Sequence, residues 1–372
     1  SVIVFGNQID SDYYGVYVPE SEDVGYDMWD HSSFTFSDFV MYGNVIFSER
    51  AGIYLERYTW GSYLHDYSEV NIHDFVVYDN KIDANDSAEG IYLFWYEIGY
   101  DNYDDSSVEV RDFIIQYNDV VSNRSTSYTE TVYIELYRMG YSLHSNSNMI
   151  IGNILIDHNK ITSLFGRALV YEMDYVGSNN HDYTYVELGS IFVQNNTISA
   201  EHTTYHYPYG IRFYNFFFGY QLYNYSSFKS GRLILENNLV DVIGYEGIYI
   251  DEEYVGDTCY DNSLVMVGDR IIRNNIVNSQ LSPGATSGGY GVMYLNYYTG
   301  SRIHQNSQVT FGDILIKNNA ITAYTYGLEL YPYFIGAHTY DSSKVVFGNY
   351  SVEDNEVITE KEYTFYFYDD YR

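Results

Sequence analysis

The chain has 372 residues, and 51 Asp and Glu against 18 Lys and Arg give it a formal charge of −33. This balance excludes nucleic acid as a partner, because binding a phosphate backbone requires a basic stripe that displaces counterions. The composition also excludes a disordered acidic tail, because 46% hydrophobic residues, with 48 Tyr among them, are ample material for a core.

Residues 1–372 carry no Pro- or Ser-rich linker and no block of like charge, which predicts a single domain. Cys259 is the one cysteine, so no internal disulfide can form. No apolar run approaches the roughly 18 to 20 residues of a membrane helix, so we expect no transmembrane segment. Because the chain starts at Ser1 rather than Met, we expect that a leader has been removed and that the protein is extracellular or on the cell surface. Five glycosylation sequons support secretion, at Asn85, Asn123, Asn195, Asn224 and Asn349.

A repeat runs through the whole chain. Its core motif is apolar, any, apolar, two polar, Asn, any, Ile or Val, and successive Asn residues are 36 to 44 residues apart. Nine Gly residues recur at the same place in the repeat, and each lies 19 residues before the next Asn. Most of the length variation lies in the turn after the Asn. A residue spacing that stays constant over most of the repeat is typical of a solenoid whose coils stack in register. The ten Asn are Asn7, Asn44, Asn80, Asn118, Asn159, Asn196, Asn238, Asn275, Asn319 and Asn355.

Within each coil the sequence predicts three short strands in chain order. The first is of the type VEVRD, the second of the type FIIQY, and the third follows the Asn and has the form GIYL. Strands that recur once per coil must stack in parallel on their counterparts, which predicts an all-β parallel β-helix. We place the Asn at a corner, because Asn tolerates left-handed backbone angles and its amide can bond to the Asn of the next coil.

The Asn-x-Ile/Val corner, as in Asn159 to Ile161, followed by the Gly-Ile-x-Leu strand, resembles the right-handed parallel β-helix proteins of the pectin-lyase-like superfamily and their generic β-helix repeats. The resemblance covers essentially residues 2 to 367. It implies a right-handed, single-stranded parallel β-helix of about ten coils and a secreted, fibre-type member. It implies no particular chemistry, because that superfamily holds lyases, hydrolases, isomerases, adhesins and viral fibres.

Two columns of outward side chains are apolar or aromatic. The middle strand carries Ile3, Val40, Val76, Ile114 and their counterparts at its outward position, so it must be covered on both faces, by the chain's own Tyr-rich loops or by another subunit. On the Gly-Ile-x-Leu strand the third residue forms a stripe of phenols that suits contact with sugar rings or another surface. This aromatic stripe is Tyr17, Tyr54, Tyr92, Tyr133, Tyr249 and Tyr366.

An acidic column lies in the loop before the first strand of each coil. Stacked coils would place its carboxylates about 4.8 Å apart, where like charges repel. The simpler interpretation is that each Asp bonds to backbone amides of its own turn, and the alternatives are that the column binds Ca²⁺ or that the protein works in acid. No other cofactor is expected. The column is Asp30, Asp66, Asp104, Asp182, Asp261 and Asp341.

The best candidate for catalysis is Arg212, with Glu172 one coil before it and Asp251 and Glu253 one coil after it. Paired carboxylates of this kind can act as acid and base in glycoside cleavage. No lyase or galacturonase signature accompanies them, so we expect that the protein is not an enzyme.

The repeat starts and stops without an amphipathic helix or polar cap, which predicts association of the chain with itself, head to tail. The leading hypothesis is therefore an extracellular structural protein that forms a filament or surface fibre with an adhesive or protective task. The alternative is a β-helix that binds or cleaves polysaccharide or contacts a cell surface.

Overall fold

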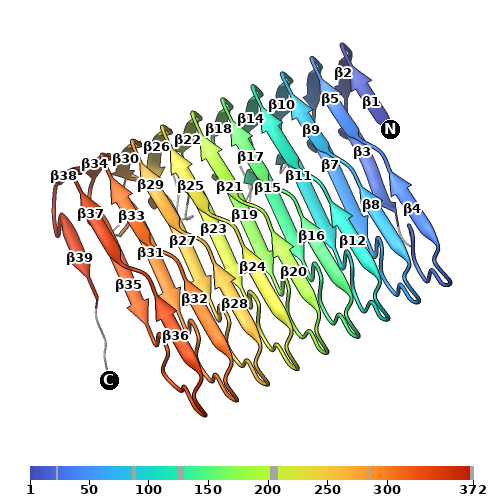
Figure 1. The fold of residues 1–372 in the computed structure, drawn as a ribbon. Helices are drawn as coiled ribbons and strands as arrows, with labels where there is room; N and C mark the ends of the chain where they lie inside the picture. The colour runs from blue at the N-terminus through green and yellow to red at the C-terminus, as the bar shows by residue number, and fades with distance from the viewer. Residues whose placement is uncertain are drawn as a thin grey trace.

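The computed structural model describes residues 1–21, 24–85, 89–123, 130–201, 208–283, 285 and 287–368. Every regular element in these ranges is a β-strand, and every pairing between strands is parallel. The chain winds as a solenoid with its termini at opposite ends, so the strands of successive coils lie side by side along one axis (Figure 1). The predicted all-β parallel β-helix is confirmed. Within the described ranges no helix has the length and apolar character to span a bilayer.

Four parallel sheets, which we name A to D, form the walls of the solenoid. Sheet A holds β1 (Val2–Phe5), β5 (Phe39–Tyr42), β9 (Phe75–Tyr78), β13 (Phe113–Gln116), β17 (Ile154–Asp157), β21 (Ile191–Gln194), β25 (Leu233–Glu236), β29 (Arg270–Arg273), β33 (Ile314–Lys317) and β37 (Tyr350–Glu353). Sheet B holds β2 (Gln8–Ser11), β6 (Val45–Ser48), β10 (Lys81–Asn85), β14 (Asp119–Asn123), β18 (Lys160–Ser163), β22 (Thr197–Glu201), β26 (Leu239–Gly244), β30 (Ile276–Leu281), β34 (Ala320–Ala323) and β38 (Glu356–Thr359).

Sheet C contains the longest strands, most of them eight residues. They are β3 (Tyr14–Ser21), β7 (Ala51–Tyr58), β11 (Glu89–Tyr96), β15 (Glu130–Tyr137), β19 (Arg167–Asp174), β23 (Tyr209–Phe216), β27 (Glu246–Glu253), β31 (Tyr290–Tyr297), β35 (Leu328–Tyr333) and β39 (Phe365–Phe367). Sheet D holds β4 (Ser33–Phe36), β8 (Glu69–Ile72), β12 (Ser107–Val110), β16 (Asn148–Ile151), β20 (Tyr185–Leu188), β24 (Ser227–Ser230), β28 (Leu264–Val267), β32 (Gln308–Phe311) and β36 (Lys344–Phe347).

Each coil therefore has four strands, and the prediction of three was wrong. The missed strand is the one of sheet B, which follows the Asn directly, as β18 follows Asn159. Its first inward side chain is the Ile or Val of the corner motif and the next is mostly a small Ser or Ala, so no apolar alternation marks a separate strand. The ten repeats enclose about nine turns of roughly 37 residues each.

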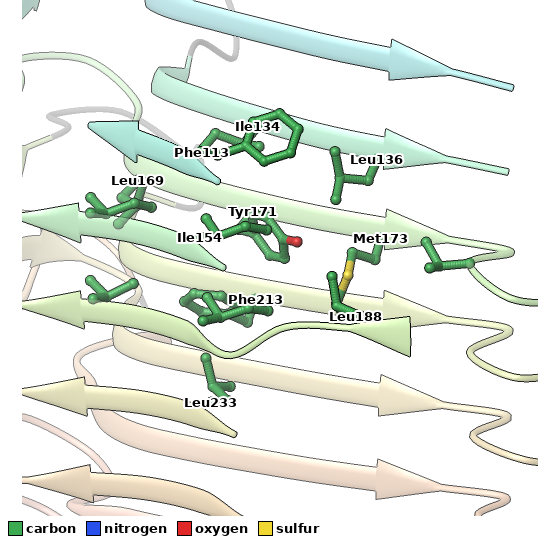
Figure 2. Close-up of a cluster of buried hydrophobic side chains, with 14 of the residues drawn as sticks. Phe113, Ile134, Leu136, Ile154, Leu169, Tyr171, Met173, Leu188, Phe213 and Leu233 are labelled. Atoms are coloured by element: carbon green, nitrogen blue, oxygen red, sulfur yellow. The ribbon is translucent and has the colours of Figure 1, made fainter. Parts of the chain in front are cut away.

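Apolar side chains of alternate positions fill the interior from all four walls. In the middle of the solenoid, Figure 2 shows side chains of sheet A, such as Phe113 and Ile154, and of sheet C, such as Tyr171 and Phe213, in one buried cluster. All four are at most 1% exposed. Because strands of one sheet repeat about every 4.8 Å, like side chains stack on like and the core continues from coil to coil.

A ladder of asparagine side chains closes the corner between sheets A and B. In all nine steps the Nδ2 of one Asn donates to Oδ1 of the next, over 2.9 to 3.1 Å, and the backbone N–H donates to the same oxygen. The eight inner Asn are at most 2% exposed, so these buried amides are satisfied by one another. The ladder consists of the ten Asn of the repeat, from Asn7 to Asn355.

The left-handed residue of this corner is the one before each Asn, and our placement on the Asn itself was wrong by one position. The φ angle of that preceding residue lies between +51° and +63° in every coil, as at Asp79 and His158. The Asn must point both its N–H and its amide along the axis toward the next Asn, so the preceding residue makes the turn.

A second ladder runs along the turn between sheets C and D. One aromatic or imidazole ring per coil stacks on the next, with centroids 3.9 to 5.4 Å apart and interplanar angles of at most 13°. Continuous stacking of this kind adds to the backbone bonds that hold coil to coil. The rings are Trp29, His65, Tyr103, His144, His181, Tyr223, Tyr260, His304 and Tyr340.

Candidate functional site on the outer face of sheet C

The aromatic stripe lies on the outer face of sheet C, and the rings of Tyr54, Tyr92 and Tyr133 stack on one another. Tyr54 and Tyr92 stack with centroids 4.6 Å apart and planes 6° from parallel, and Tyr92 and Tyr133 stack at 5.2 Å. Tyr17 at the first coil is 47% exposed, whereas Tyr54, Tyr92, Tyr133, Tyr249 and Tyr366 are half-buried. The ring faces point along the solenoid axis toward each other, so ring edges and hydroxyl groups face outward. Between stacked neighbours no free face is left for a sugar ring.

The same face is partly covered by the chain itself. Val170 and Glu329 belong to the column of the stripe, and they are 0% and 2% exposed. The chain's own segments therefore bury this part of sheet C. The outward column of sheet A differs, because Ile3 is 59% exposed and Val40, Val76 and Ile114 are half-exposed.

Phenol hydroxyl groups of the stripe donate to carboxylates on the same face. Tyr249 donates to Asp251 over 2.9 Å, and Tyr133 donates to Glu172 over 3.0 Å. Successive residues of a strand alternate faces, so a Tyr and an acid two positions apart meet. Burial, followed by the neighbouring carboxylates, raises the pKa of both phenols.

Three of the four predicted catalytic residues lie together in what we call the Arg212 cluster: Glu172 on β19, Arg212 on β23, and Tyr249 with Asp251 on β27. Arg212 Nη1 lies 3.2 Å from Glu172 Oε1, and their side chains are 19% and 23% exposed. The rings of Tyr209 and Tyr214 flank the guanidinium group, which lies 5.5 and 5.3 Å from their centroids. The cation is thus held between two rings and a carboxylate.

Asp251 is 6% exposed, and burial, with the charge of Glu253 as the second cause, raises its pKa to about 7. Burial also raises the pKa of Glu253. Strand register places Glu172, Tyr214 and Asp251 in one column, so the two acids are two strand spacings apart, or ~9.6 Å between Cα atoms. Glu253 is the fourth predicted residue, and it pairs in register with Phe216 at the far end of the strand.

Chemically, the cluster offers a carboxyl group that is partly protonated at neutral pH and a second carboxylate beside a fixed cation. Glycosidases use two carboxyl groups in such roles, one as the acid and one as the base or nucleophile. A cavity of about 380 Å³ opens at the last coil, lined among others by Leu328, Val357 and Phe365, and no member of the Arg212 cluster lines it.

The acidic column proposed for Ca²⁺ lies in turns of left-handed backbone. Asp30, Asp66, Asp104, Asp182, Asp261 and Asp341 have φ between +51° and +59°. Each of these six coils contributes one carboxylate to the column, and in the described part of the chain no three His, Cys, Asp or Glu converge as a metal site would require. Calcium binding by this column stays a prediction of the sequence.

The five sequons fall at different depths. Asn85, Asn224 and Asn349 are exposed, and Asn123 and Asn195 are half-buried. The amides of Asn195 and Asn224 donate to Asp157 over 2.9 Å and to Asp182 over 2.8 Å, so a glycan at either site would displace a hydrogen bond between coils.

Sequence reasoning missed two groups of charged residues. On sheet C, Arg167 pairs with Glu130 at 3.0 Å, and the buried Glu246 has a pKa raised by burial and then by Glu329. In the core, Arg270 pairs with Glu252. The signal for the core pair was present in the repeat, because Arg270 stands where other coils place Phe, Ile or Leu.

No protein-family model, no curated protein and no solved structure matches this chain.

Proposed function

We propose that this protein is a structural β-solenoid, a rigid rod that acts outside the cell, of the right-handed type that the pectin-lyase-like resemblance implies. The observation that supports it is the continuity of the asparagine ladder, whose nine steps all have the same geometry. In a solenoid each coil contacts only its neighbours, so uniform links make a rod without a weak joint.

The arrangement of the outward side chains agrees with this task. The stripe of phenols is occupied with stacking on itself and with donating to carboxylates, and Glu172 and Arg212 are paired with each other. These contacts link neighbouring strands of sheet C. They leave few groups of the stripe to receive a ligand.

We further propose that copies of the chain join end to end. Inward-facing side chains of the terminal coils are exposed, with Val2 at 43%, Phe365 at 46% and Phe367 at 43%. A coil of a second copy stacked on either surface would cover them and extend all four sheets. Because such contacts repeat without closing, the product would be a filament.

The test is negative-stain microscopy and sedimentation of the purified 372-residue chain over a range of concentrations. Filaments should form, and Phe365→Asp should abolish them because it places a charge on an inward side chain of the last coil. Tyr366→Asp is the matched control, since this neighbour in β39 points outward and is half-buried. A chain that stays monomeric at high concentration would refute end-to-end joining.

A second candidate function, cleavage of a polysaccharide, is favoured by the Arg212 cluster alone. In it, Asp251 would donate a proton to the leaving oxygen and Glu172 would activate water. Neutral and acidic polysaccharides should be screened for release of reducing or unsaturated ends. Glu135 is the neighbour of Glu172 in register on β15, and it serves as the control. Cleavage that Asp251→Asn and Glu172→Gln both abolish, while Glu135→Gln keeps it, would establish the enzyme. An inactive wild type would exclude these substrates.

A further inference from the structure

Two exposed tyrosines of neighbouring coils face each other on the turn between sheets C and D. The rings of Tyr183 and Tyr225 are stacked with centroids 5.0 Å apart and planes within 1° of parallel. They are 62% and 53% exposed, so an external reagent can reach both. In the described part of the chain, no hydrogen bond holds either hydroxyl group.

The surrounding turn fixes this pair in register. On one side, Asn224 Nδ2 donates to Asp182 Oδ1 over 2.8 Å. On the other side, Thr184 Oγ1 donates to Ser226 Oγ over 2.9 Å between buried side chains. The backbone N–H of Tyr183 donates to the Asn224 carbonyl oxygen over 2.9 Å. The two Cα positions are therefore held together while the rings stay free to turn, which raises the effective concentration of one ring near the other.

Few other tyrosines combine these properties. Among the described residues, the one other contacting pair with both rings exposed is Tyr78 and Tyr117, and those rings meet edge-on at 68°. Tyr67 occupies the same turn position as Tyr183 and is 59% exposed, but its stacking neighbour is His31. Tyr67 therefore has the accessibility of the pair without a tyrosine partner.

We propose that Tyr183 and Tyr225 are a site of oxidative modification, at which a peroxidase-type oxidant joins them into an intrachain dityrosine. Each phenol loses one electron and one proton to give a phenoxyl radical. The two radicals couple by a carbon–carbon bond between ring positions ortho to the hydroxyl groups, and the proton on each coupled carbon moves to oxygen. Two tyrosines and one hydrogen peroxide thus yield one dityrosine and two waters.

The cross-link would bridge the turns that follow β19 and β23 in the middle of the rod. Formation of the cross-link depends on the geometry of the turn and not on the function of the protein, so the test of this site is independent of the proposed function. A covalent bond between coils limits the separation of the two coils in the unfolded chain, as a disulfide does, although Cys259 cannot supply one.

The experiment treats dilute, unglycosylated protein with a peroxidase and hydrogen peroxide, so that no glycan at Asn224 shields Tyr225. Trypsin cleaves after Arg167, Arg212 and Lys229, which separates the two tyrosines into peptides 168–212 and 213–229. Mass spectrometry should find these peptides joined with the loss of two hydrogen atoms. The yield should not depend on protein concentration, because the coupling is within one chain.

Tyr183→Phe and Tyr225→Phe keep the stacked ring and remove the phenol, so each should lower the yield of the joined peptides at least about tenfold. Tyr67→Phe is the matched control and should leave the yield unchanged. Circular dichroism checks that each variant is folded. Three results would overturn the proposal: joined peptides that persist in Tyr183→Phe, coupling confined to Tyr78 and Tyr117, or a product that forms only between chains.

Discussion

Arg270 Nη2 lies 2.7 Å from Glu252 Oε1 inside the solenoid, and the two side chains are 3% and 0% exposed. Two further donors reach the same carboxylate, the Tyr294 hydroxyl group and, over 2.9 Å, Asn215 Nδ2. A charge this deep is tolerated because every carboxylate oxygen is paired. On sheet A the pair interrupts an apolar column, because Leu233 and Ile314 flank Arg270, whereas on sheet C the neighbours of Glu252 are the buried Asn215 and Asn296.

Breaking this pair should be costly. Glu252→Leu leaves the Arg270 guanidinium group buried without a partner, and we expect it to lower the free energy of unfolding by about 3 to 5 kcal/mol. Adding Arg270→Leu removes the unpaired charge and restores the apolar column of sheet A, while the Tyr294 hydroxyl and the Asn215 amide stay without their acceptor, so the double variant should recover part of that loss. Urea denaturation of both variants measures the difference. A double variant as unstable as Glu252→Leu would show that the pair stabilises the fold in its own right.

The asparagine ladder gives a second prediction. Asn159 is 2% exposed, and its Nδ2 donates to Asn196 Oδ1 over 3.1 Å and to the Ile115 carbonyl oxygen over 2.8 Å. Asn159→Ala leaves buried groups of two coils unpaired, and we expect a loss of about 3 kcal/mol in urea denaturation. The control Asn71→Ala removes a single hydrogen bond on the outer face of sheet D and should cost below about 0.5 kcal/mol. Equal losses in both would contradict a structural role for the ladder.

The glycine found near the start of the sheet C strand in seven of the ten coils tests how closely the coils approach. A Cβ on Gly247 would lie 2.3 Å from Val277 Cγ1 and 2.6 Å from the Gly291 carbonyl oxygen. Gly247→Ala should therefore destabilise by about 3 kcal/mol, seen as a lower melting temperature. Ala168 fills the same slot in its coil, so Ala168→Gly serves as the control, with a loss of about 1 kcal/mol at most. An unaffected Gly247→Ala would mean that the coils can separate at little cost.

Stability should rise as the pH falls from about 8 to about 5. Burial is the first cause that raises the pKa of Asp174, Asp251 and Glu329 to about 7, whereas in the unfolded chain such groups titrate near 4. Between these values the folded protein binds more protons than the unfolded chain, so raising the pH through this window lowers the free energy of unfolding. The net charge of −33 also lowers the free energy of unfolding as the pH rises, because the ionised carboxylates of the folded chain repel one another.

The measurement is the urea midpoint from about pH 5 to about pH 8, with an expected drop of a few kcal/mol in the free energy of unfolding. Asp251→Asn no longer titrates and should show a shallower dependence on pH than the wild type. Asp157, whose pKa is lowered by hydrogen bonds from Asn195 and His158 despite its burial, contributes with the opposite sign, below about pH 4. A midpoint that rises with pH would contradict the assignment of these buried acids.

Much of the architecture was predictable because each structural position of a coil occurs about ten times in the sequence. Ten Asn at spacings of 36 to 44 residues indicated a parallel solenoid. The period-2 alternation of Gly-Ile-Tyr-Leu also placed Tyr54 and Tyr92 on the outer face of a strand. In a solenoid, a column in the aligned sequence is a row in space, so these predictions required no knowledge of distant contacts.

Other features needed the tertiary structure, because they depend on how side chains of different columns meet. The repeat placed Glu172, Arg212 and Asp251 on three successive coils, but only the stacking of three strands showed that Arg212 pairs with Glu172 and that Asp251 is buried. It could not show that the stacked phenols cover each other's faces, since ring orientation depends on rotamers and on neighbours one coil away. Sequence by itself determined the order and period of the coils. The three-dimensional packing decided which of their polar groups are paired, buried or open to solvent, because burial and pairing depend on contacts across the coil and not on position along it.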